Sequence, residues 1–71
     1  MINVEGRHPS TVNLARFFAY DHLPVHLQET SRLCHNLAED MVDSLSDGPE
    51  LTAGLRHLLE AKDCFVRAAL P

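Results

Sequence analysis

The chain has 71 residues, 45% of them hydrophobic and 23% charged. This composition predicts one small folded domain and excludes a disordered segment or a large enzyme. The formal net charge of -4 at pH 7 argues against binding DNA or RNA, because general affinity for nucleic acid comes from neutralising phosphates. No stretch approaches the roughly 20 apolar residues that span a bilayer, and the N-terminus lacks a secretory apolar core, so we expect a cytoplasmic protein without membrane contact.

The first part of the chain, residues 1–16, has no sustained hydrophobic period and contains Gly6 and the His8-Pro9 pair. We therefore expect an irregular N-terminal arm, with a short helical turn at about residues 13–17. The arm would depend on a partner surface for its order.

Three of the four aromatic residues follow at once, namely Phe17, Phe18 and Tyr20. Packing into the core is the more frequent outcome for the two phenylalanines. Tyr20 is as well suited to stacking on a flat ligand as to packing, because its hydroxyl needs a polar partner.

The first long helix is predicted over residues 24–45. Pro24 fits its first turn, where a missing N–H has no partner to lose, and no further Gly or Pro occurs before Gly48. Apolar side chains recur at intervals of three, four and seven residues, at Leu27, Cys34, Leu37, Met41 and Leu45. This spacing indicates one apolar stripe along the helix, with polar residues on the opposite face.

A tight turn is predicted at Asp47-Gly48-Pro49-Glu50, followed by a second helix over residues 49–70 with leucines at helical spacing. Gly54 is its weak point, because Gly costs about 1 kcal/mol relative to Ala inside a helix. Its missing side chain would, however, let another helix approach closely.

The predicted fold class is all-α: an antiparallel two-helix hairpin over residues 17–71, preceded by the arm of residues 1–16. Each helix would be about 30 Å long at 1.5 Å per residue. Two helices alone cannot cover both apolar stripes, so we expect a homo-oligomeric helical bundle, most simply four helices from two hairpins.

The five histidines raise the question of a metal site, since His22 and His26 are four residues apart and would share a helix face. Cys34 would lie about 18 Å from His22 along a continuous helix, too far for a common ion. We therefore expect surface histidines and neither a metal nor another cofactor.

Enzymatic activity is not expected either. Cys34 precedes His35 and Asp63 precedes Cys64, but neighbours on a helix point about 100° apart and do not form a hydrogen-bonded pair. The chain has no GxSxG motif and no Gly-rich phosphate loop. We expect both cysteines to be reduced and at least partly buried. A DNA-reading helix-turn-helix is disfavoured by the helix lengths and the acidic balance.

Three segments carry a resemblance to a known family. They are Phe18-Ala19-Tyr20-Asp21-His22-Leu23-Pro24, the Asp47-Gly48-Pro49-Glu50 turn, and the stretch from Glu60-Ala61-Lys62-Asp63 to Val66-Arg67-Ala68-Ala69-Leu70-Pro71. Together they resemble the helical-hairpin domain of phage anti-CBASS and Thoeris anti-defence sponge proteins, over about residues 17–71. The resemblance implies homo-oligomers, from dimer to hexamer, that sequester a cyclic di- or trinucleotide between protomers without cleaving it.

The resemblance also implies ligand-binding residues. Tyr20 matches the aromatic residue before the first helix, which would stack on a base, and Arg67 matches the basic residue near the end of the second helix, which would contact phosphate. Lys62 is a weaker match. For the basic residue partway along the first helix, the nearest candidates are Arg32 and His35.

A second hypothesis needs no ligand. The first helix carries little permanent positive charge, whereas the two phosphates of a cyclic dinucleotide need donors or cations. The alternative is a scaffold whose apolar stripes bind a second copy or another helical protein, without a small molecule.

Overall fold

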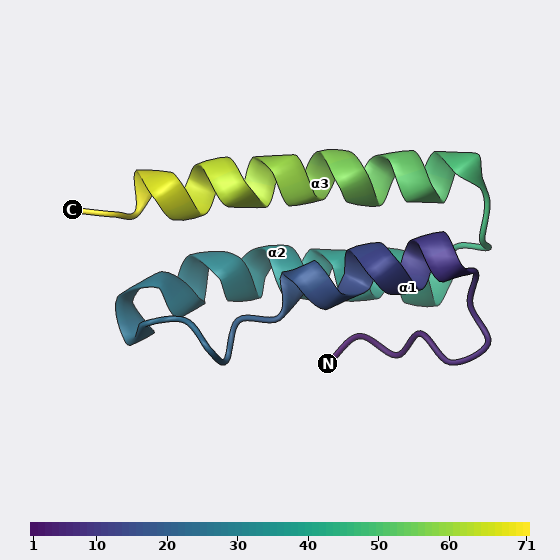
Figure 1. Ribbon diagram of the computed structural model, residues 1–71, viewed down its shortest axis with the longest axis horizontal. Helices are drawn as coiled ribbons and strands as arrows, with labels where there is room; N and C mark the ends of the chain where they lie inside the picture. Colours follow the sequence, from purple (N-terminus) through teal and green to yellow (C-terminus); the bar gives the residue numbers. More distant parts are fainter.

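The computed structural model describes residues 1–71 and contains only helical regular structure. Its elements are α1 (Pro9–Ala15), a 3₁₀ turn η1 (Arg16–Phe18), α2 (Val25–Ser44) and α3 (Pro49–Ala68). α2 and α3 run antiparallel and pack along each other (Figure 1). The all-α class is confirmed, and the two long helices end within two residues of their predicted bounds. None of the helices combines the length and apolar character needed to cross a membrane.

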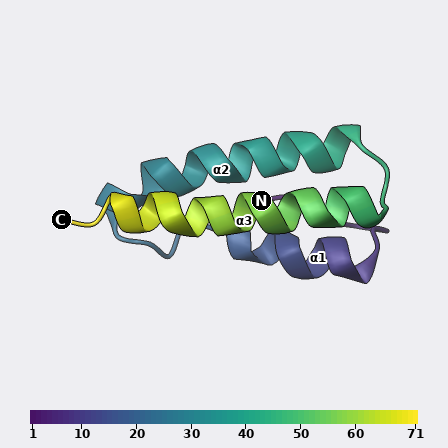
Figure 2. The same cartoon turned by 90° about the horizontal axis from the view of Figure 1, so that it is seen from above.

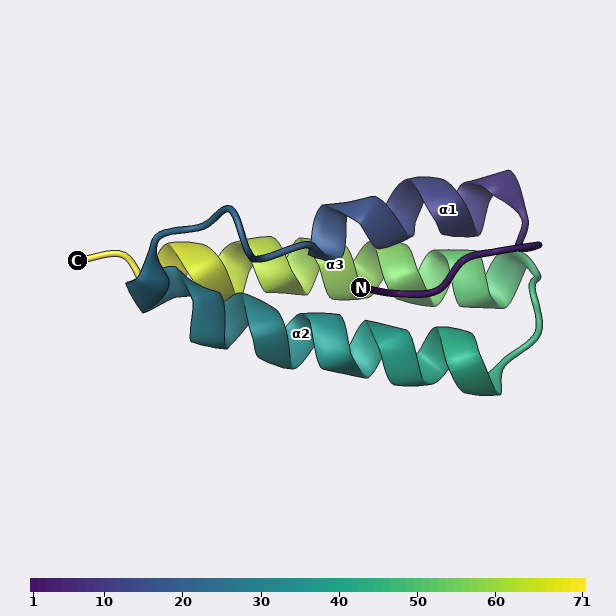
Figure 3. The same ribbon diagram turned by 90° about the horizontal axis from the view of Figure 1, so that it is seen from below.

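The arm of residues 1–16 differs from the prediction, because more than half of it is helical or packed on the hairpin. α1 lies against α3, and α1 and α2 lie on opposite sides of α3 when the molecule is seen from above (Figure 2). The N-terminal segment runs between α1 and α2 (Figure 3), where the Ile2 side chain is buried. The arm therefore finds its partner surface within its own chain.

The N-terminal segment and every helical element contribute side chains to the core. Its buried members are Ile2, Ala15, Phe18, Cys34, Ala38, Val42, Leu51 and Leu55. Phe18 is fully buried whereas Phe17 is 49% exposed, so the packing prediction holds for one phenylalanine and is wrong for the other. The 3₁₀ turn explains the difference, because its two consecutive side chains point in different directions and only one can face the hairpin.

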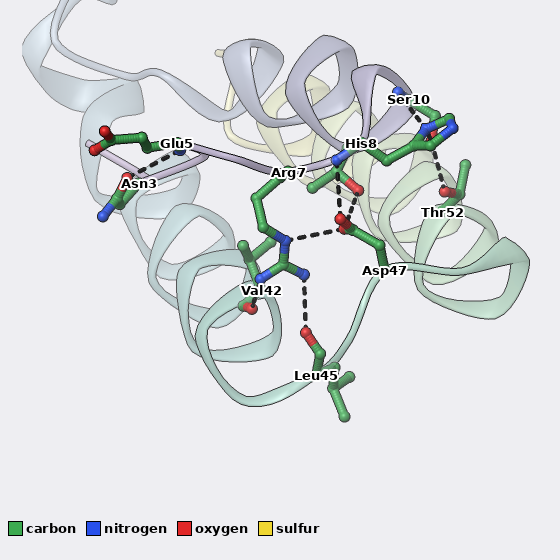
Figure 4. A network of polar contacts seen from close by, with 10 residues as sticks. Asn3, Glu5, Arg7, His8, Ser10, Val42, Leu45, Asp47 and Thr52 are labelled. Atoms are coloured by element: carbon green, nitrogen blue, oxygen red, sulfur yellow. Dashed lines mark hydrogen bonds and ion pairs between the residues drawn. The ribbon is translucent and has the colours of Figure 1, made fainter.

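A polar clasp holds the arm to the turn between α2 and α3 (Figure 4). The Arg7 guanidinium donates to the Asp47 carboxylate at 2.9 Å and to the carbonyl oxygens of Val42 at 2.7 Å and Leu45 at 2.8 Å. Val42 lies in the last turn of α2 and Leu45 directly follows that helix, so no further helical N–H is available to either carbonyl. Arg7 thus caps the C-terminal end of α2 and anchors the arm to it.

Asp47 is the centre of this clasp. Its carboxylate accepts hydrogen bonds from the His8 backbone N–H at 2.8 Å and from the Thr11 hydroxyl at 3.0 Å, besides the one from Arg7. The His8 N–H and then the Arg7 guanidinium hold the pKa of this carboxyl below its ordinary value, because they stabilise the charged form.

The two cysteines have different environments. Cys34 is buried in the core, and burial raises the pKa of its thiol. Cys64 is exposed on α3, so the expectation of partial burial is wrong for this residue.

Candidate functional site

A basic pocket lies beside the C-terminal half of α3, where η1 and the segment before α2 pass close to it. It has a volume of about 360 Å³. Its lining residues are Arg16, Phe17, Ala19, His22, Leu23, Lys62, Asp63, Val66 and Arg67. Two of the residues predicted from the sequence, Lys62 and Arg67, are therefore brought together.

Lys62 and Arg67 reach the basic pocket from the same helix. Only 13% of the Lys62 side chain is exposed, and its Nζ lies 3.1 Å from Oδ1 of Asp63. Its aliphatic stem therefore packs against protein while its ammonium stays at the pocket. Arg67 is exposed, and its Nη2 makes only a weak contact of 3.4 Å with the Cys64 sulfur. Its guanidinium donors are largely free for a ligand.

Arg16 brings a third permanent positive charge from η1. Its guanidinium carbon lies 4.8 Å from the centre of the Phe17 ring, a cation–π contact that orients the side chain without neutralising it. No carboxylate lies within ion-pair distance of Arg16 or Arg67. The lining thus has three permanent cations and one carboxylate, in a chain with a net charge of -4.

Tyr20 and His35 lie together, but in a neighbouring cavity. Their rings meet edge to face, with centroids 5.2 Å apart and an interplanar angle of 73°. They line an arm pocket of about 420 Å³ that also includes Ile2 and Val4 of the N-terminal segment. Arg16 and Ala19 line both cavities, so the arm pocket and the basic pocket adjoin each other across η1.

Arg32 lines neither pocket. Its guanidinium forms a two-point ion pair with Glu29 one turn earlier on α2, with Nε 3.1 Å from Oε2. The hydrogen bonds from Arg32 lower the pKa of the Glu29 carboxyl. The guanidinium is therefore already engaged, and the structure places this candidate apart from the other four.

Arg16 and His22 are two basic side chains of the pocket that the sequence did not indicate as ligand-binding. Arg16 lies in the segment predicted to be irregular, and no local pattern links it to α3, more than 40 residues later. The spacing of His22 and His26 suggests only a metal site, and we expect His22 to lie on the surface. No group of three or more His, Cys, Asp or Glu side chains is close enough to hold a metal ion.

Comparisons with known proteins give no relative: no family model, curated protein or solved structure matches this chain. The residues of the two pockets are therefore what supports a functional proposal.

Proposed function

We propose that this protein is a non-enzymatic binding protein that holds a phosphate-bearing small molecule in the basic pocket, and that its ligand is a cyclic nucleotide second messenger. The observation that carries the proposal is the convergence of Arg16, Lys62 and Arg67, half of the six Lys and Arg residues of the chain, on one pocket. The resemblance to anti-defence sponges supplies the ligand class.

The pocket chemistry suits phosphate. Guanidinium groups remain charged at any physiological pH and offer paired N–H donors that match two phosphate oxygens, whereas an ammonium acts as a point charge. Arg16 and Arg67 would supply the paired donors and Lys62 the point charge. The pocket is at the lower end of the size range of small-molecule sites, about 300 to 1,000 Å³. A cyclic di- or trinucleotide seated there would project outward, where a second protomer would complete the site.

Tyr20 and His35 would contribute to the same ligand from the arm pocket. The arm pocket is mostly apolar and adjoins the basic pocket, so a base could lie against Tyr20 while its phosphate meets Arg16. Arg32 has no part in this proposal, because it is paired with Glu29.

The protein would act by mass action. A sequestering protein lowers the free concentration of a messenger only if its sites outnumber the messenger and bind it more tightly than the effector does. No bond of the ligand is made or broken.

The test is calorimetric titration of the purified protein with a panel of cyclic di- and trinucleotides. Arg16→Gln and Arg67→Gln should each weaken binding about tenfold or more, because a hydrogen bond to a charged group contributes about 1.5 to 3 kcal/mol. Arg56→Gln is the matched control, since Arg56 lies on the same helix as Arg67 but lines a separate hollow near the α2–α3 turn. Absence of binding across the panel, or equal loss in the control, would contradict the proposal.

The second candidate function, self-association or protein interaction without a small ligand, is favoured by a different observation. α2 leaves a row of large apolar side chains exposed.

A further inference from the structure

α2 carries an apolar ridge that nothing in the chain covers. Leu33, Leu37, Met41 and Leu45 follow one another at intervals of four residues and are 58%, 48%, 38% and 48% exposed. Residues four apart on a helix lie one above the other. The four side chains therefore form a continuous line about 18 Å long on one side of α2.

An apolar groove lies directly beside this ridge, between α2 and α3. It has a volume of about 370 Å³. Its apolar lining consists of Leu37, Met41, Leu45, Leu51, Leu55 and Leu58. Gly54 also lines it, and a Cβ added to Gly54 would meet no atom within 4 Å. The close approach that Gly54 permits is therefore not used inside the chain.

The ridge and groove together form an exposed apolar patch as large as the largest found on typical monomers, which are often functional. Phe65 extends the ridge on α3, because it lies seven residues after Leu58 and therefore on the same side of that helix. The four ridge side chains and Phe65 together expose roughly 450 Å². This area lies within the range of about 300 to 600 Å² that the largest patches on monomers cover. Two such patches facing each other would bury roughly 900 Å², and the groove walls would bring the total near the 1,000 Å² of a specific interface.

We propose that this face binds a second copy of the chain, with the ridge of each copy packed against the groove of the other around a two-fold axis. A two-fold interface requires one surface to be complementary to itself. This face meets the requirement because ridge and groove lie side by side on it, and rows of residues four apart pack into matching grooves when helices cross. The product is a four-helix assembly in which the exposed stripe of α2 becomes part of a common core.

The charges at the rim predict how the association responds to salt. Asp40 lies three residues after Leu37 and is exposed, and Glu50 lines the groove. Two copies would bring these carboxylates toward each other, so screening by salt should strengthen the association. Binding of a Lys-rich amphipathic helix to the same face would instead weaken as salt rises.

The experiment is sedimentation velocity of the nucleotide-free full chain over about a hundredfold range of concentration, at low and high salt. The native protein should form a dimer, or a larger assembly of dimers, that tightens with salt. Leu33→Lys and Leu37→Lys should raise the dissociation constant at least about tenfold. Val25→Lys is the control, because Val25 is 84% exposed and, as the first residue of α2, lies about 12 Å before the ridge begins at Leu33.

Gly54→Leu provides a second variant that should keep the fold of the single chain. A Cβ at this position meets no atom within 4 Å, and Leu has a higher helix propensity than Gly, yet the leucine side chain would fill the groove that the second copy needs. It should therefore give a folded monomer with native helicity by circular dichroism. A native protein that stays monomeric would overturn the proposal, also if it binds a Lys-rich helical peptide instead. A dimer that is unaffected by Gly54→Leu, or that Val25→Lys weakens as much as the ridge variants do, would overturn it as well. Because no nucleotide is present, either result is independent of the proposed ligand.

Discussion

The Arg7 guanidinium and the Asp47 carboxylate meet at 2.9 Å across 40 positions of the sequence. This pair joins the N-terminal arm to the turn between α2 and α3, while two further Arg7 donors occupy the carbonyls of Val42 and Leu45. The arm in turn forms one wall of the arm pocket. The clasp therefore tethers the same arm whose residues line that pocket.

Removing the charge of Asp47 should loosen the arm. In Asp47→Asn an amide NH₂ replaces an oxygen that accepts a hydrogen bond, and the attraction to Arg7 is lost. We expect a lower melting temperature and faster hydrogen exchange at the His8 amide, which donates to Asp47. Asp43→Asn, an exposed carboxylate on α2, is the control. Unchanged exchange at His8 in Asp47→Asn would show that the clasp does not hold the arm.

The same carboxylate predicts a pH dependence. Its pKa in the folded protein lies below the ordinary value of about 3.9. Between those two pKa values the unfolded chain binds a proton that the folded chain does not. The contribution of Asp47 to the free energy of unfolding is therefore fully present above this pH window and is lost as the pH decreases through it. Urea unfolding from pH 7 down to about pH 3 should show this loss in the native protein and a shallower one in Asp47→Asn. Parallel curves would contradict the assignment.

Ser31 should be replaceable with a gain in stability. Its Oγ is fully buried on α2 and has no hydrogen-bond partner, and an unpaired buried polar group costs about 1 to 3 kcal/mol. Ser31→Ala should raise the free energy of unfolding by about 1 kcal/mol, measured by urea unfolding. Ser44→Ala is the matched change, because that hydroxyl is exposed and bonds the Asp40 carbonyl. A large loss in Ser31→Ala would indicate that the hydroxyl has a partner.

The burial of the core predicts different effects of two alanine substitutions on the free energy of unfolding. Leu55 is 2% exposed and Val25 is 84% exposed. Leu55→Ala should lower the free energy of unfolding by about 2 to 5 kcal/mol, through lost burial and a cavity. Val25→Ala should change it by less than about 0.5 kcal/mol. Similar losses in the two variants by chemical unfolding would mean that the core lies elsewhere.

The long helices were predictable because their signals are local. The apolar spacing from Leu27 to Leu45 repeats with the helix period, and Gly48-Pro49 interrupts it where the chain turns. The arm was not predictable in this way. Its order comes from contacts distant in sequence, such as Arg7 with Asp47 and the burial of Ile2 in the core, which leave no periodic signal in residues 1–16.

The candidate site, too, was predictable in part, where its residues lie close in the sequence. Lys62 and Arg67 lie five residues apart on one helix, so the sequence places them about 7.5 Å apart along its axis but about 140° apart around it. Arg16 joins them only because η1 lies near the α3 side of the hairpin, and the path of a connecting segment depends on tertiary packing. Arg32 is a candidate through the resemblance, but Glu29 lies one turn away and pairs with it.

The measurement that most directly tests the central proposal is a two-dimensional NMR titration of the labelled protein with the cyclic nucleotide that binds most tightly in calorimetry. Binding in the basic pocket predicts the largest shifts at the Arg16 and Arg67 side-chain N–H groups and at the amides around Lys62, with little change near Arg56. Shifts centred near Arg56 and the α2–α3 turn, or no shifts at a saturating ligand concentration, would contradict the account.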